Sequence, residues 1–238
     1  MTPPIAPPAA PCFFEQNPAL ALSRRAFAEC VGTLLLMMVV TGAALTGQRL
    51  SGGQQELGLL VSALAASGSL VGLILALGSV SGGHFNPLIT MLQWLSGERT
   101  LRCTVAYVAG QLVGAAIGAL LANRLFAASS CVPHTLLSDA TWVLSEVVAS
   151  CGLMIIVFGC SRGAKSLTGP FGVGAWLMAA IVATPSGSLA NPAIALAALL
   201  STGPIAMNVH TAASSLVAQI AGALLAYLVI VIVYPRAQ

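Results

Sequence analysis

The chain has 238 residues, of which 58% are hydrophobic and only 6% are Asp, Glu, Lys or Arg. Soluble domains carry about 25% charged residues, so this composition excludes a water-soluble globular protein and indicates an integral membrane protein. The formal net charge is only +3 and the basic residues form no continuous stripe, so we expect no nucleic-acid partner.

The chain begins with a proline-rich segment. Residues 1–11 contain five prolines, but they have neither the basic stretch nor the apolar core of a signal peptide. We predict that residues 1–23 form a disordered, polyproline-like tail. The remainder, residues 24–238, is expected to form a single domain in the membrane.

Six long apolar segments follow, over residues 26–46, 56–78, 101–126, 140–160, 170–185 and 210–234. A transmembrane helix needs about 20 apolar residues, and lipid tolerates only helices or closed barrels. The segments lack the polar and apolar alternation of barrel strands. The sequence therefore predicts an all-α membrane protein with six transmembrane helices.

The basic residues of the connections are unevenly distributed if these helices alternate in direction. One side would carry most of them, namely Arg24, Arg25, Arg99, Arg102, Arg162, Lys165 and Arg236. The other side would carry only Arg49 and Arg124. The positive-inside rule then predicts that both termini are cytoplasmic.

Two further apolar stretches are too short to cross a membrane. They run from Asn86 to about Ser96 and from Asn191 to about Ser201, which is half of a span. Each follows the second long helix of its half of the chain. Short segments at matching places predict two re-entrant half-helices within inverted repeats, at about residues 24–126 and 137–235.

The two halves also share sequence features in the same order. A glutamate opens the first helix, an Asn-Pro pair opens the half-helix, and a glutamine lies in the third helix. These pairs are Glu29 and Glu146, Asn86-Pro87 and Asn191-Pro192, and Gln111 and Gln219. Because each half contains an odd number of long helices, the second copy is expected to be inverted.

The Asn-Pro pairs carry the chemistry of the predicted site. Asn is a good N-cap and Pro is favoured at the first helical position. The two amide hydrogens of each capping Asn would remain free to donate outward. If the half-helices meet end to end, their positive N-termini repel cations, whereas Asn86 and Asn191 offer donors to a neutral solute. We therefore predict a pore that admits neutral solutes and excludes ions and protons.

Three further polar residues are candidates for the site. Glu29 and Glu146 lie in apolar segments, where a carboxylate is costly unless it is paired or faces a cavity. We interpret them as acceptors for the backbone leading into each half-helix; the alternatives are a proton relay and a simple position near a helix start. His84 is a candidate donor in the pore vestibule, or else an ordinary loop histidine.

The stretches Ser81-Gly-Gly-His-Phe-Asn-Pro-Leu88 and Ser188-Leu-Ala-Asn-Pro-Ala193 resemble the major intrinsic protein family, the aquaporins and aquaglyceroporins. The likeness covers about residues 24–235. It implies an aquaporin-like fold, usually a homotetramer with one pore per subunit, and no cofactor or metal. The implied pore midplane consists of Asn86, Pro87, Leu88, Asn191, Pro192 and Ala193.

The sequence departs from this family at two positions. Leu88 stands where Ala is usual, and Ile194 stands where an Arg normally lines the outer constriction. Counting from the two Asn residues places the other constriction residues at Ala66, Ala179 and Ser188. Such a ring would be wide and uncharged. We therefore expect solutes larger than water: glycerol-like polyols, urea or neutral metalloid hydroxides such as arsenite.

The missing Arg also resembles a bacterial subgroup associated with arsenic resistance, which implies a bacterial inner membrane. Two alternatives within transport are a water-selective aquaporin and a proton-coupled secondary transporter that uses Glu29 and Glu146. A membrane enzyme is a third alternative, but the sequence has no cluster of catalytic residues.

Overall fold

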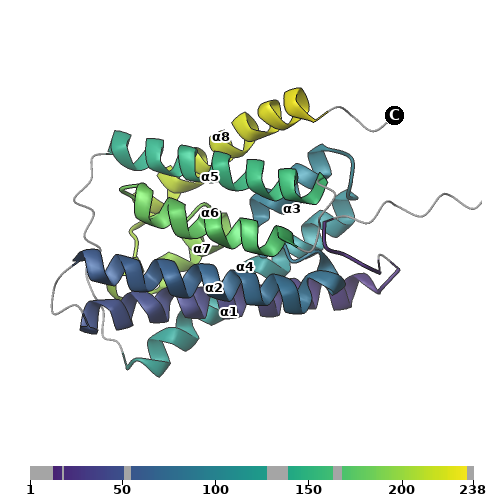
Figure 1. Ribbon diagram of the computed structural model, residues 1–238. Coiled ribbons are helices and arrows are strands. Elements are labelled where there is room, and N and C mark those ends of the chain that lie inside the picture. Colours follow the sequence, from purple (N-terminus) through teal and green to yellow (C-terminus); the bar gives the residue numbers. More distant parts are fainter. Residues whose placement is uncertain (1–12, 18, 51–54, 128–138, 163–167, 235–238) are drawn as a thin grey trace, which may run out of the picture.

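The structure is a computed structural model that describes residues 13–17, 19–50, 55–127, 139–162 and 168–234. Within these ranges all regular structure is helical. The elements fall into long helices and short ones around the centre of the bundle (Figure 1). This agrees with the all-α class that the composition and the absence of alternation predict.

The six long helices are α1 (Leu22–Leu50), α2 (Gln55–Ser81), α4 (Leu101–Leu125), α5 (Asp139–Arg162), α6 (Gly169–Ala183) and α8 (Val209–Val233). The short elements are α3 (Pro87–Leu95), α7 (Pro192–Ala197) and the 3₁₀ turns η2 (Ala198–Leu200) and η3 (Gly203–Ile205). Five of the long helices are long and apolar enough to cross a membrane, whereas α6 has only 15 residues within the described ranges. Each predicted apolar segment thus corresponds to one helix.

The two halves of the chain pack in the same way. In the first half α1 packs against α2 and α4, and in the second half α5 packs against α6 and α8. Contacts between α2 and α6 join the halves, while α3 and α7 contact each other. The two halves therefore repeat one packing pattern, each with three long helices and one short helix.

Small residues allow α4 to lie close to α1. A Cβ atom at Gly110 would lie 2.7 Å from the carbonyl oxygen of Ala26, and one at Gly114 would overlap that of Cys30. The second half repeats this approach, because a Cβ at Gly222 would overlap the carbonyl oxygen of Val147. Close contact between small residues is how helices associate when lipid supplies no hydrophobic driving force.

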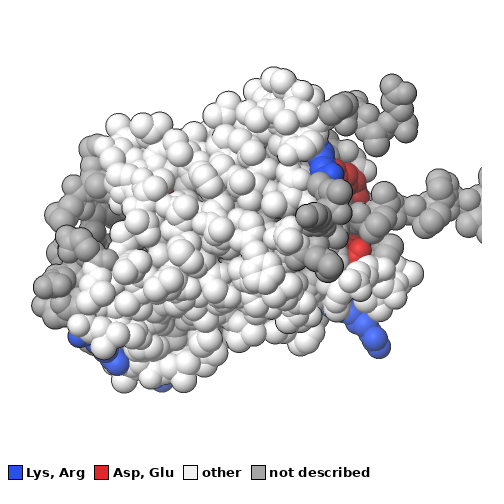
Figure 2. Space-filling model, viewed as in Figure 1, with Lys and Arg blue, Asp and Glu red and all other residues white. Residues whose placement is uncertain are grey.

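The two ends of the bundle differ from its flanks. Helix α1 begins and α8 ends at the same end (Figure 1), which we call the terminal end. Charged side chains gather at the ends, and the flank between them is almost entirely uncharged (Figure 2). Large apolar side chains such as Leu64, Val105, Val217 and Leu228 are exposed on the outside of the helices. This surface suits a lipid environment.

The N-terminal region differs from the expected disordered tail. Residues 1–12 and 18 lie outside the described ranges, but residues 13–17 pack against the terminal end of the bundle. Glu15 is only 3% exposed and pairs with Arg25 and Arg99. Arg99 is distant along the chain, so local composition gives no sign of this contact.

Candidate functional site

The half-helices α3 and α7 begin at the two Asn-Pro pairs. Asn86 and Asn191 have extended backbones, and each side chain caps its helix. The Oδ1 atom of Asn86 accepts from the backbone N–H of Leu88 at 3.0 Å, and that of Asn191 accepts from Ala193 at 3.0 Å. The capping geometry is the one that the residue types favour.

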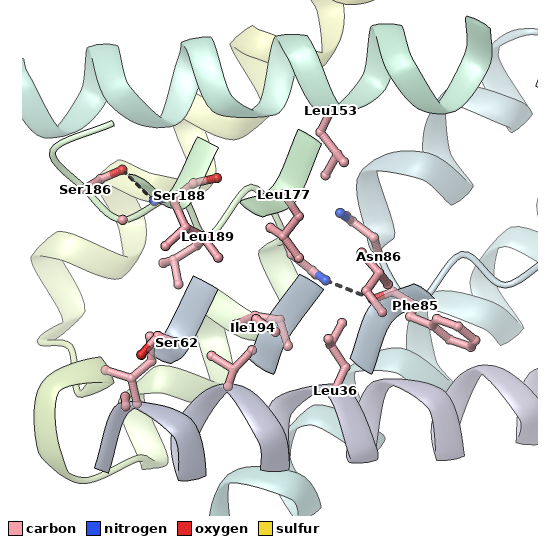
Figure 3. Close-up of a pocket in the computed structure, with 18 of the residues that line it drawn as sticks. Leu36, Ser62, Phe85, Asn86, Leu153, Leu177, Ser186, Ser188, Leu189 and Ile194 are labelled. Carbon is pink, nitrogen blue, oxygen red and sulfur yellow. Dashed lines mark hydrogen bonds between the residues drawn. The ribbon is translucent and has the colours of Figure 1, made fainter. Parts of the chain in front are cut away.

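Each capping Asn also contacts the opposite half. The Nδ2 atom of Asn86 donates to the carbonyl oxygen of Ala190 at 2.8 Å. The Nδ2 atom of Asn191 donates to the carbonyl oxygen of Phe85 at 2.8 Å, the bond drawn to Phe85 in Figure 3. One amide hydrogen of each Asn is thus committed to the opposite loop. This differs from the expectation that both hydrogens are free, and it leaves one per Asn for a solute.

The loop before α3 is held by Glu29. Its Oε1 atom accepts from the hydroxyl of Ser81 at 2.6 Å and from the backbone N–H of His84 at 3.0 Å. Its Oε2 atom accepts from the backbone N–H of Phe85 at 2.7 Å and from Gln111 at 2.7 Å. The loop backbone has no regular partner, so these bonds satisfy buried N–H groups.

The loop before α7 is held by Glu146 in the same way. Its Oε1 accepts from the hydroxyl of Ser186 at 2.8 Å and from the N–H of Leu189 at 3.0 Å. Its Oε2 accepts from the N–H of Ala190 at 3.1 Å and from Gln219 at 2.7 Å. The donors correspond one for one with those of Glu29. Both carboxylates are fully buried, and neither is among the residues that line the cavity.

A cavity of about 750 Å³ runs between the helices and past both Asn residues. Two stripes at helical spacing form much of its wall and are apolar apart from Ser62: Ser62, Ala66, Leu70 and Ile74 on α2, and Val173, Leu177 and Ile181 on α6. Its polar groups come mainly from the two loops and caps, including His84, Asn86, Ser186, Ser188 and Asn191. Figure 3 shows the labelled Leu36, Leu153, Leu177 and Ile194 around this space.

Three of the four predicted constriction residues line the cavity: Ala66, Ser188 and Ile194. Ser188 has a positive φ of 47°, and its hydroxyl is buried without a hydrogen-bond partner among the described residues. It is therefore available to a solute. Ile194 is buried one turn after Asn191. This part of the wall therefore carries an aliphatic side chain at the position where the resemblance led us to look for an Arg.

The fourth predicted residue, Ala179, is not brought to the cavity. It lies exposed on α6, whereas Leu177 and Ile181 face the space. A non-helical stretch separates the end of α6 at Ala183 from Asn191, so the distance in residues from Asn191 does not fix which residues of α6 face the cavity. Counting back without a gap therefore loses the helical phase, which advances 100° per residue.

The remaining predicted midplane residues lie behind the caps. Pro87, Leu88, Pro192 and Ala193 are buried at the junction of α3 and α7, and they are not part of the cavity wall. Leu88 instead joins the hydrophobic core. Its extra bulk relative to Ala is thus accommodated in the packing between helices.

His84 lines the cavity, but its ring nitrogens already have neighbours. Nδ1 lies 2.9 Å from the hydroxyl of Thr90, and Nε2 lies 3.4 Å from a guanidinium nitrogen of Arg99. The side chain is buried at the terminal end of the cavity. His84 thus lies on the pore wall, as expected of a vestibule residue, but both its ring nitrogens have partners, as expected of an ordinary loop histidine.

Sequence reasoning missed several wall residues. Leu36 and Leu153 line the cavity, as do Val40 and Val157 one turn further on. Each leucine lies about two turns after the glutamate of its half, on the same helix face. The repeat alignment contained this signal. It contained no signal for Phe13 and Phe14, which line the terminal end.

Comparisons with known proteins agree with this geometry. The family described as Major intrinsic protein matches residues 17–184. The chain is 37% identical over 182 residues to Aquaglyceroporin AqpS of Rhizobium meliloti (strain 1021), covering 74% of this chain and 75% of that protein. It is 30% identical over 200 residues to Aquaporin AqpM of Methanothermobacter marburgensis, covering 73% and 81%. The solved aquaglyceroporin from Plasmodium falciparum superposes with a TM-score of 0.71 at 19% identity, covering 88% of this chain and 96% of that one.

Proposed function

Because this chain belongs to the major intrinsic protein family, a family of membrane channels rather than enzymes, we propose that its pore is specialised for neutral solutes larger than water. Membership itself makes the chain a channel for water and small neutral solutes such as glycerol. The proposed cargo comprises glycerol-like polyols, urea and neutral metalloid hydroxides such as arsenite.

Ile194 is the observation that carries the proposal. It occupies the wall position where the family places a charged donor, and within the described residues no Asp, Glu, Lys or Arg lines the cavity. Narrow water filters need strong donors and bulk, whereas Ala66 leaves space and Ser188 offers one free hydroxyl. The name of the relative AqpS, an aquaglyceroporin, points in the same direction.

Exclusion of ions is proposed to arise where α3 and α7 meet. The reciprocal Asn86 and Asn191 bonds bring the two helix N-termini together. Each N-terminus carries about half a positive charge, so a cation at this point is repelled from both sides. A neutral solute instead receives one N–H from each Asn.

Glu29 and Glu146 are proposed as positioning residues for the two loops. Each carboxylate uses both oxygens to accept hydrogen bonds, and neither lines the cavity. A proton relay needs a carboxylate that exchanges protons with the transport path. This geometry therefore favours the positioning role over coupled transport.

A water-selective channel is the second candidate, and one observation favours it. Ile181 and Leu177 occupy the wall where the sequence suggested Ala179, so the constriction is narrower than a ring of small residues. The two candidates differ in glycerol and urea permeability, which makes them separable by one assay.

We further propose a homotetramer in a bacterial inner membrane with both termini in the cytoplasm. Support for this orientation comes from Arg24, Arg25, Arg99 and Arg162 in the helices and connection at the terminal end. Lys165 and Arg236 lie outside the described residues. The proposed homotetramer rests on family resemblance.

The proposal is tested by light scattering from proteoliposomes under water, glycerol, urea and arsenite gradients at neutral pH, where arsenite is an uncharged hydroxide. Wild type is expected to pass all four. Ile194→Arg is expected to lower glycerol and urea permeability at least tenfold and to retain water permeability, because it adds bulk and a charged donor. Ile194→Leu is the uncharged control and should resemble wild type.

Two outcomes would contradict the proposal. Wild-type liposomes that pass water but none of the larger solutes would establish the water-selective alternative. Unchanged glycerol flux through folded Ile194→Arg would show that Ile194 is not part of the constriction.

A further inference from the structure

The cavity is bounded at its terminal end by the segment Phe13–Asn17, which precedes α1. Phe13 and Phe14 both line the cavity. The ring centroid of Phe13 lies 5.4 Å from that of His84 and 5.3 Å from that of Phe158. His84 belongs to the loop of the first half and Phe158 to α5 of the second half. The Phe13 ring therefore bridges the two halves across this end of the pore.

Ion pairs hold the segment in place. Glu15 lies 2.6 Å from Arg25 and 3.1 Å from Arg99, and its side chain is almost fully buried. Arg99 stacks over the ring of Tyr107 at 4.6 Å. The backbone N–H of Gln16 donates to the carbonyl oxygen of Ser79 at the end of α2, at 3.0 Å. Release of the segment would remove this carboxylate from the buried Arg99 guanidinium, which is costly, so the segment is anchored directly after Phe13 and Phe14.

The Phe14 side chain packs into a space between α2 and α6 that two glycines leave open. A Cβ atom at Gly169 would lie 2.6 Å from the Phe14 ring, and one at Gly78 would lie 3.1 Å from the Phe14 Cβ atom. Glycine at these positions in α2 and α6 thus leaves room for the phenylalanine. The ring fills space between the two helices whose stripes form the pore wall.

The backbone of Phe13 is itself constrained. Its φ is +60°, in the left-handed region that a bulky residue rarely adopts. Such a conformation persists where the surroundings over-determine it. Here the surroundings are the rings of His84 and Phe158 on one side and the Glu15 ion pairs on the other.

From these contacts we infer that Phe13 forms a second constriction of the pore, at the terminal end, and limits both the rate and the size of the solutes that pass. This inference rests on the proposed channel function. Phe13 precedes the region that matches the family, which begins at residue 17. The match to the family model therefore does not include this second constriction, which is additional to the one around Ile194.

The test compares initial rates of glycerol and urea flux through wild type and three variants in proteoliposomes. Phe13→Ala removes the ring and should raise glycerol flux at least threefold, with a smaller increase for urea because urea is the smaller solute. Glu15→Gln weakens the anchor and should raise flux in the same direction. The double variant should match Phe13→Ala, because both changes open the same constriction.

Phe27→Ala is the matched control, because Phe27 is 69% exposed on the outside of α1 and does not line the cavity. It should conduct like wild type. If wild type conducts and the folded Phe13→Ala and Glu15→Gln variants show the same flux, the proposed second constriction is wrong and the channel function stands. Flux in Phe13→Ala with none in wild type would support a fully closed state. Absence of flux in wild type and every variant would contradict the channel and the constriction together.

Discussion

At the scale of single residues, the two buried glutamates show how a membrane protein keeps irregular backbone in its interior. Each carboxylate accepts two bonds from loop N–H groups and two from side chains, one a serine at the start of or within the loop and the other a glutamine on another helix. An unpaired N–H group in lipid or protein interior costs several kcal/mol. One carboxylate therefore supplies hydrogen-bond acceptors to the backbone N–H groups of a non-helical loop, which have no partner in a helix or sheet.

Replacing Glu146 by Gln tests this role. The amide offers one oxygen acceptor and turns an N–H₂ group towards the remaining donors, so at least one buried N–H or O–H loses its partner. We expect a loss of about 1–3 kcal/mol in stability, seen as a lower apparent melting temperature in detergent. Glu98→Gln is the control, since its pair with Arg162 is partly exposed and such pairs contribute little. Equal melting temperatures for Glu146→Gln and wild type would contradict the role.

The residue scale also shows what the sequence could predict about the site. Asn86, Asn191, Ser188 and Ile194 were identifiable because each lies in or beside a motif with fixed local geometry. Ala179 was misplaced relative to the cavity because its position depended on where α6 ends. Phe13 gave no local signal, since its partners His84 and Phe158 are distant in sequence.

At the scale of elements, the Asn-Pro rule sets where the half-helices start but not how they end. Helix α3 starts at Pro87 and α7 at Pro192, as the residue types predict. Helix α3 continues to Leu95, whereas α7 is α-helical only to Ala197 and finishes as a 3₁₀ turn to Leu200. Both short helices contact α4 and α8, and the two apolar stretches are equally long in sequence, so the Asn-Pro pairs alone do not predict where each helix ends.

The contact between α1 and α4 yields a prediction at the same scale. Gly114→Ala places a methyl group against the carbonyl oxygen of Cys30, so the helices must separate. Gly72→Ala makes the same change in α2, where a Cβ meets nothing within 4 Å. We expect Gly114→Ala to lower the apparent melting temperature, and Gly72→Ala to leave it unchanged or raise it, since Ala is about 1 kcal/mol better than Gly in a helix. Indistinguishable melting curves for the two variants would refute the close contact.

At the scale of the whole molecule, the contacts between the two repeats distinguish a fixed pore from an alternating-access transporter. Inverted repeats also build secondary transporters, in which one bundle rocks against the other. Here the caps of α3 and α7 bond across the halves, and α2 packs against α6. These contacts tie the repeats together at the point where a rocking mechanism would need them to part.

We therefore expect glycerol flux to rise in proportion to the glycerol gradient and to be unaffected when an imposed pH gradient is collapsed with an ionophore. Stopped-flow light scattering on the same liposomes gives both measurements. Saturation at millimolar glycerol, or a rate that follows the pH gradient, would instead indicate coupled transport through Glu29 and Glu146. The motif pairs predicted this architecture from sequence because they depend on the order of segments rather than on the details of contacts.

The crossed bonds between the caps and the opposite loops also bear on how the chain is made. Asn86 donates to Ala190, and Phe85 accepts from Asn191, so neither loop has its central partner until the ribosome has passed residue 191. A nascent chain that carries only the first half thus holds one wall of a pore and none of its closing contacts. The junction between α3 and α7 therefore cannot close until the second half of the chain has been synthesised.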